Sequence, residues 1–97
     1  MIVRFLSSAN RDLDAILREV RERSPQGARR VADRVDEIIV QLEQHPHSGP
    51  SMNEGGVHRL PLTPYPYIVF YRLTKDAVEV VGVRHAARDP ASMPDAP

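Results

Sequence analysis

Two neighbouring segments with apolar residues at helical spacing constrain the fold of this chain more than any other feature. In the first segment, apolar side chains recur every three or four positions, at Leu13, Ile16, Leu17 and Val20. In the second, residues 28–42, the same spacing puts aliphatic side chains on one side and charged ones on the other. Ser24-Pro25 lies between them, with serine suited to an N-cap and proline to a first helical turn. The pattern predicts two amphipathic helices in an antiparallel hairpin with one shared apolar side.

Strand-like segments flank the predicted hairpin on both sides. Residues 2–6 alternate as a short strand does, and Ser7 or Ser8 can then cap the first helix. His45-Pro46 ends the second helix, and a loop rich in proline and glycine follows. Beyond that loop the chain contains three strand-like runs, at residues 57–62, 67–73 and 78–84. The short connections between these runs require an antiparallel meander.

The expected fold is therefore α+β. It consists of an N-terminal strand, an antiparallel helix hairpin and a three-stranded antiparallel meander, which together form a curved antiparallel sheet covered on one face by two helices. A length of 97 residues suits one domain. We place this domain at residues 1–88 and expect residues 89–97, which contain three prolines and no apolar pattern, to be a mobile tail.

Composition excludes several classes of site. The chain has no cysteine, which removes disulfides, thiolate nucleophiles and thiol metal ligands. His45 and His47 flank Pro46 without a third ligand nearby, so we expect no metal and no other cofactor. Its formal net charge of +0 gives no overall attraction to nucleic acid. No long apolar run follows Met1, which predicts neither a signal peptide nor a membrane span, and hence a cytoplasmic protein.

The run at residues 67–73 is apolar on both of its faces. Tyr67, Val69 and Tyr71 alternate with Ile68 and Phe70, yet two helices on one side can cover only one face of the sheet. We therefore expect an exposed apolar face that another chain covers. The alternative is that a loop or the C-terminal tail of the same chain lies across it.

Four motifs, in order, carry a resemblance to a known family: S-S-A-N-R-D-L-D-A-I at 7–16, H-P-H-S-G-P at 45–50, Y-P-Y-I-V-F-Y-R at 65–72 and V-G-V-R-H-A-A-R-D-P at 81–90. Together they resemble the RelE/ParE toxins of bacterial type II toxin–antitoxin systems. The resemblance implies a cognate antitoxin that wraps and neutralises the toxin. It also implies one of two targets: ParE-like members act on DNA gyrase without cleavage, whereas RelE-like members cut messenger RNA on the ribosome.

The residues favour the ParE branch. Arg59 and Arg84 match cationic positions that the resemblance assigns to RelE-like nucleases, but Pro61 and Ile68 stand where two further cations are expected. No tyrosine follows Arg84, and Pro90 lies in that vicinity. The first hypothesis is therefore a gyrase-binding toxin that is not an enzyme. The alternatives are a metal-independent, ribosome-dependent endoribonuclease and an inactive toxin-derived partner within an antitoxin complex.

Candidate site residues come from the cationic and aromatic positions of the meander. For contact with the target or the antitoxin we select Arg59, Tyr67, Tyr71, Arg84, His85 and Arg88. A nuclease would use Arg59, Arg84, His85 and Arg88, with His85 for acid–base chemistry. The competing interpretation of His85 is that it only forms a hydrogen bond with the backbone at the end of its strand. The charged helix faces are interpreted as ordinary solvent-exposed surface.

Overall fold

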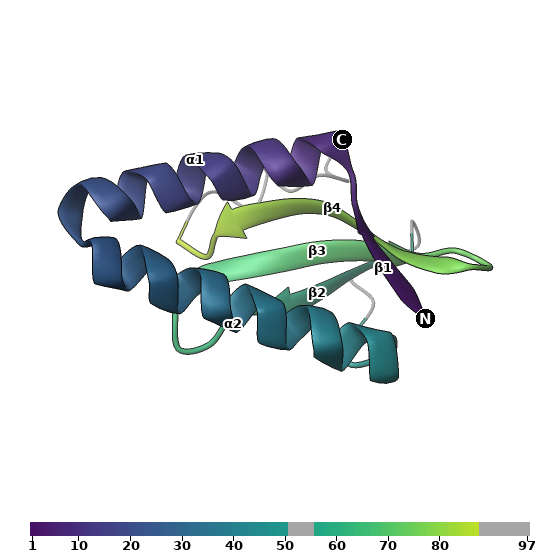
Figure 1. Ribbon diagram of the computed structural model, residues 1–97. Coiled ribbons are helices and arrows are strands. Elements are labelled where there is room, and N and C mark those ends of the chain that lie inside the picture. Colours follow the sequence, from purple (N-terminus) through teal and green to yellow (C-terminus); the bar gives the residue numbers. More distant parts are fainter. Residues whose placement is uncertain (51–55, 88–97) are drawn as a thin grey trace.

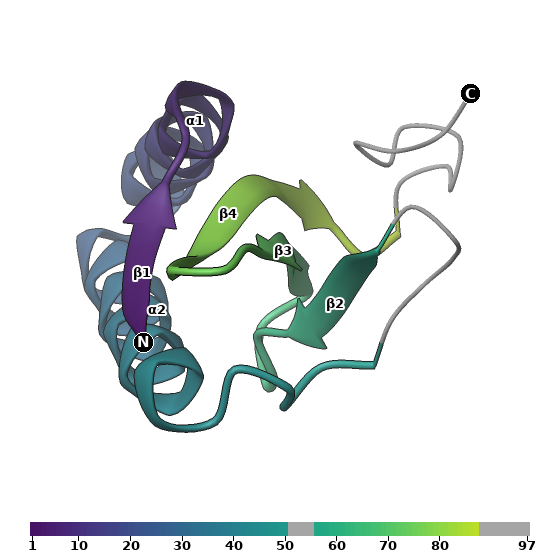
Figure 2. The same cartoon turned by 90° about the vertical axis from the view of Figure 1, so that its right-hand side faces the viewer.

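The fold is described from a computed structural model over residues 1–50 and 56–87. The element order there is β1 (Ile2–Phe5), α1 (Ser7–Arg23), α2 (Pro25–Gln44), β2 (Val57–Pro61), β3 (Tyr67–Leu73) and β4 (Ala77–His85). The strands form one sheet in the order β1-β4-β3-β2, and both helices lie on the same side of it (Figures 1 and 2). The predicted α+β class and element order are confirmed. Arg88 and the expected tail at 89–97 lie outside the described residues.

The junction between the two helices forms as the sequence predicts, whereas the start of α1 differs from the prediction. Ser24 Oγ accepts a hydrogen bond from the Gly27 N–H at 2.9 Å, and Pro25 is the first residue of α2. The predicted serine cap of α1 is wrong, because the N-cap residue is Leu6 and no side chain caps the helix. Ser8 already lies within the first turn, and its hydroxyl donates instead to the carbonyl oxygen of Val81 at 2.8 Å.

The sheet is mixed, and the direction of β1 is the reason. β2, β3 and β4 form the predicted antiparallel meander. β1 lies parallel to β4, with Ile2–Phe5 opposite Ala77–Val80. The meander could be predicted because short turns force neighbouring strands to reverse. The direction of β1 depends instead on a connection through two helices and a loop, which local patterns do not constrain.

The main core lies between the helices and the sheet. Val35, Ile38 and Leu42 of α2 are at most 4% exposed and belong to one cluster with Tyr71 and Val80 from the sheet. The apolar stripe of the hairpin is therefore core, as its spacing predicts. Neither described helix is apolar enough along its length to cross a membrane.

The exposed apolar face predicted on the other side of the sheet is not present. Val57, Ile68 and Phe70 form a second cluster on this face and are only 5%, 6% and 1% exposed. Two local features contribute to this packing. Phe70 lies opposite Gly82, which has no side chain to compete for space, and a register shift in the β3–β4 ladder accompanies Val81, which packs against the same cluster. The curved sheet, visible end-on in Figure 2, therefore holds its own second apolar cluster.

Candidate functional site

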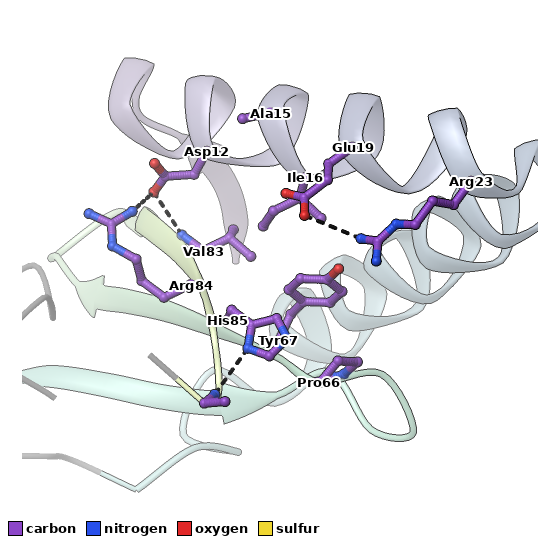
Figure 3. Close-up of a pocket in the computed structure, with 11 residues that line it drawn as sticks. Asp12, Ala15, Ile16, Glu19, Arg23, Pro66, Tyr67, Val83, Arg84 and His85 are labelled. Atoms are coloured by element: carbon purple, nitrogen blue, oxygen red, sulfur yellow. Dashed lines mark hydrogen bonds and ion pairs between the residues drawn. The ribbon is translucent and has the colours of Figure 1, made fainter. Parts of the chain in front are cut away.

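An open groove lies between α1 and the adjoining ends of β3 and β4 (Figure 3). Its volume is about 890 Å³. The lining combines apolar, aromatic and charged residues: Asp12, Ala15, Ile16, Glu19, Arg23, Pro66, Tyr67, Val83, Arg84, His85 and Ala87. Three predicted site residues, Tyr67, Arg84 and His85, are thus brought together here.

The groove exists because β1 is shorter than β4. The pairing of β1 ends where Phe5 meets Val80, so within residues 1–50 and 56–87 the later part of β4 has no neighbouring strand on that edge. Two side chains of α1, four residues apart, supply hydrogen bonds there instead. Ser8 donates to the Val81 carbonyl at 2.8 Å, and Asp12 Oδ2 accepts from the Val83 N–H at 3.0 Å. Because exposed strand edges leave backbone groups unpaired, these contacts fix α1 against β4.

Arg84 reaches the groove by crossing the edge of β4. Its register opposite Ile68 assigns it to the face of the sheet that points away from the helices. The guanidinium nevertheless donates to Asp12 Oδ2 on α1, forming an ion pair in which the two side chains are 34% and 22% exposed. This carboxylate therefore contacts both the β4 backbone and the Arg84 side chain (Figure 3).

His85 and Tyr67 form the aromatic part of the groove. They are partners across the β3–β4 ladder, and their rings meet edge to face with centroids 5.4 Å apart. The Ala87 N–H donates to His85 Nδ1 at 3.1 Å. Since that nitrogen accepts, the neutral imidazole carries its proton on Nε2. The backbone hydrogen bond considered for His85 is therefore present, and it fixes the tautomer of a groove residue.

Glu19 and Arg23 line the groove further along α1. Their carboxylate and guanidinium lie 3.2 Å apart, four residues apart in the helix. The side chains are 65% and 71% exposed, so solvent screens the pair and it contributes little to stability. Both charges are accessible to a partner.

Arg59 lies away from the groove. It pairs with Phe70, whose side chain belongs to the cluster on the face away from the helices. Arg72 is on this same face, where it forms a 3.5 Å ion pair with Glu79. The structure therefore separates Arg59 from His85 by the thickness of the sheet.

Tyr71 is buried, and the prediction that it contacts a partner is wrong. It is 0% exposed and anchors the loop after α2. Its hydroxyl accepts from the Gly49 N–H at 2.9 Å and donates to the Pro46 carbonyl at 3.1 Å, while the His58 ring stacks on it at 5.0 Å. Burial raises the pKa of Tyr71 above its ordinary value of 10.0, and the hydrogen bond to Gly49 lowers it by a smaller amount. Aromatic packing thus explains this residue.

Sequence reasoning missed the contribution of α1. Ser8, Asp12 and Glu19 belong to a helix whose charged faces were interpreted as ordinary surface. Ser8 and Asp12 form hydrogen bonds with the open edge of β4, and Asp12 and Glu19 line the groove. A signal was available, because Ser8, Asp12 and Ile16 follow one another at four-residue spacing and so continue the apolar side of the helix. Among the described residues there is no group of three or more potential metal ligands. Arg88, also selected from the sequence, lies outside the described residues.

Comparison with known proteins agrees with the fold. A family model described as "ParE toxin of type II toxin-antitoxin system, parDE" matches residues 3–90. "Putative toxin Y4kP" of Sinorhizobium fredii (strain NBRC 101917 / NGR234) is 33% identical over 84 residues, which cover 87% of this chain and 86% of that protein. A solved structure described as "Chromosomal ParDE TA system from P. aeruginosa" superposes with a TM-score of 0.76 at 23% identity, over 88% of this chain and 95% of the other, and shows the shared fold.

The fold and the family match define a toxin of a type II toxin–antitoxin system. Within that class, the chain belongs to the ParE family, the branch that its residues favoured.

Proposed function

We propose that this ParE-family toxin inhibits growth by binding DNA gyrase, and that a cognate antitoxin neutralises it. The observation that carries the proposal is the separation of the candidate nuclease residues. Arg59 lies on the face of Phe70, away from the helices, whereas His85 lies on the helix side with Tyr67.

RNA cleavage through the 2′-hydroxyl needs acid–base groups and cations around a single phosphate. Side chains alternate between the two faces of a sheet, and the strand pairing places Arg59 and His85 on opposite faces. A phosphate group bound beside His85 is therefore remote from Arg59. Of the candidate nuclease cations, Arg84 shares the groove with His85, and its guanidinium already contacts the Asp12 carboxylate. A carboxylate at that position opposes the build-up of negative charge in a phosphoryl transition state. The arrangement favours a binding surface over a nuclease site.

The antitoxin partner is supported by the family and by the similar fold of the P. aeruginosa protein, which comes from a ParDE system. The proposed contact residues in the groove are Tyr67, Arg84 and His85, with Arg59 on the opposite face and Arg88 beyond the described part of the chain. Arginine guanidinium groups suit carboxylates of an acidic protein segment, because they donate in a planar fork. A short neighbouring reading frame with a DNA-binding N-terminus and an acidic, amphipathic C-terminus is the expected antitoxin gene.

The direct test measures the supercoiling activity of purified DNA gyrase with increasing amounts of the toxin, with and without its antitoxin. We expect inhibition that the antitoxin reverses. In parallel, primer extension on messenger RNA from cells that express the toxin detects cleavage. Cuts within codons, without gyrase inhibition, would replace this proposal by the nuclease. Normal growth with neither effect would indicate an inactive binding partner.

Two substitutions test the proposed contacts. Arg84→Ala and Arg88→Ala should each reduce toxicity, because each removes a charged contact. Arg72→Ala is the matched control, since that arginine is 50% exposed and forms an ion pair on the other face, where the loss costs little. If Arg84→Ala remains as toxic as Arg72→Ala, Arg84 is not a contact residue.

A further inference from the structure

We propose that Asp12 is a positioning residue: its carboxylate draws Arg84 around the open edge of β4 and holds it at the edge of the groove that His85 also lines. The inference rests on the proposed function in one respect, namely that Arg84 contacts the target. The positioning itself is a physical property of the toxin and can be measured without any target.

The starting point is that Arg84 and His85 are consecutive residues of one strand. Side chains of consecutive strand residues leave on opposite faces. Arg84 pairs with Ile68, which belongs to the cluster away from the helices, and His85 pairs with Tyr67, which packs on the helix side. An ordinary strand would therefore keep these two side chains apart, yet both line the same groove.

An open strand edge makes the crossing possible. β1 pairs with β4 only as far as Val80, so no strand of the described part of the chain blocks the path of the Arg84 side chain around the edge. Asp12 lies there because α1 packs along this part of β4. The Val83 N–H donates to Asp12 Oδ2 at 3.0 Å and so fixes the carboxylate relative to the strand.

The ion pair is shielded better than the other pair in the groove. The side chains of Arg84 and Asp12 are 34% and 22% exposed, against 71% and 65% for Arg23 and Glu19. Partial burial strengthens a charge-assisted hydrogen bond, whereas solvent screens an exposed one. Asp12 therefore restricts the orientation of the Arg84 side chain.

The first test measures the mobility of the Arg84 side chain by NMR, from the heteronuclear relaxation of its Nε–H group. Asp12→Asn keeps an oxygen that can accept from the Val83 N–H but removes the charge, and Asp14→Asn is the matched control on the exposed side of the same helix. We expect an ordered Arg84 Nε–H in the wild type and in Asp14→Asn, and a mobile one in Asp12→Asn. An Arg84 that stays equally ordered in Asp12→Asn would overturn the proposal.

A second variant guards against loss of folding. Asp12→Glu retains the carboxylate and displaces it by one methylene group. We expect it to shift the Arg84 Nε–H resonance, and the proposal fails if this resonance matches the wild type while that of the Val83 amide moves. Far-UV circular dichroism of each variant confirms that the fold is retained.

The functional test compares Asp12→Asn, Arg84→Gln and the double variant in growth arrest and gyrase inhibition. We expect Asp12→Asn to weaken both by about tenfold, the loss typical of a charge-assisted hydrogen bond. In the Arg84→Gln background it should add nothing, because Asp12 acts through Arg84. An equal loss in both backgrounds would indicate a purely structural role and overturn the proposal. If growth arrest follows this pattern while gyrase is never inhibited, the proposed target fails and the positioning role stands.

Discussion

Replacing Tyr71 by phenylalanine removes a buried hydroxyl that ties β3 to the loop after α2. That hydroxyl accepts from the Gly49 N–H at 2.9 Å and donates to the Pro46 carbonyl at 3.1 Å. A typical hydrogen bond contributes about 1 kcal/mol, and a buried donor left unpaired costs about 1–3 kcal/mol. We therefore expect Tyr71→Phe to lower the free energy of unfolding by roughly 2–3 kcal/mol. For a domain of this size, that corresponds to a fall in Tm of roughly 10–20 °C.

The same substitution should change how stability depends on pH. Burial raises the pKa of Tyr71 above 10.0 in the folded state, so the folded protein holds this proton more tightly than the unfolded chain does. The stabilisation that the protonated Tyr71 hydroxyl gives to the folded state is fully present below pH 10.0. It is lost as the pH rises above that value towards the pKa of Tyr71 in the folded state. The wild type should therefore lose stability in alkaline solution more steeply than Tyr71→Phe, because every other titrating group is common to both.

Urea unfolding followed by circular dichroism, repeated from neutral to alkaline pH, measures both effects. Tyr65→Phe is the matched control: its ring also packs against the main core, and within the described residues its hydroxyl has no hydrogen bond. A Tyr71→Phe protein within about 0.5 kcal/mol of the control would refute the assigned hydrogen bonds. Parallel pH profiles for wild type and Tyr71→Phe would refute the raised pKa.

Three further substitutions test the packing. Gly49→Ala should lower the free energy of unfolding by roughly 2–4 kcal/mol, because a Cβ there would overlap the backbone carbonyl of Arg59 and lie 3.0 Å from Tyr71 Oη. Gly56→Ala is the control: Gly56 has a φ of 76° and open space around it, so this change should cost only about 1 kcal/mol. Ser24→Ala should lower the free energy of unfolding by about 1 kcal/mol, because it removes the N-cap of α2. An unchanged Tm in thermal unfolding would contradict the stabilising role of this cap. Ile38 is 2% exposed, so Ile38→Ala should lower the free energy of unfolding, measured by chemical denaturation, by about 2–5 kcal/mol. Val40→Ala is the control, because Val40 lies in the same helix and is 50% exposed. An equal loss of stability in both variants would contradict the assigned burial of Ile38.

Strand faces do not decide the outcome for the candidate site, because Tyr67 and Tyr71 both lie on the helix-facing side of β3. Tyr67, Arg84 and His85 were selected from the sequence and meet in the groove, while Tyr71 was selected with them and is buried. Alternation places Tyr67 and Tyr71 on one face of β3, but it does not say which of the two is buried under the helices and which lies at the groove. The burial of Phe70 on the other face was missed for a related reason. The packing around Phe70 involves Gly82 and Val81 of β4 and the register shift between β3 and β4 at this point.

The sequence alone determined the elements whose causes are local. Helical spacing specified the hairpin, Ser24-Pro25 its junction, and the short turns the antiparallel meander, while the motifs indicated the family. Only the tertiary structure decided the parallel pairing of β1, the open edge of β4 beyond Val80 and the placement of Asp12 at that edge. These features depend on contacts between residues more than 70 positions apart, such as Asp12 with Arg84. Hydrophobic periodicity records which side of an element is buried, whereas such contacts follow from how elements of unequal length are packed together.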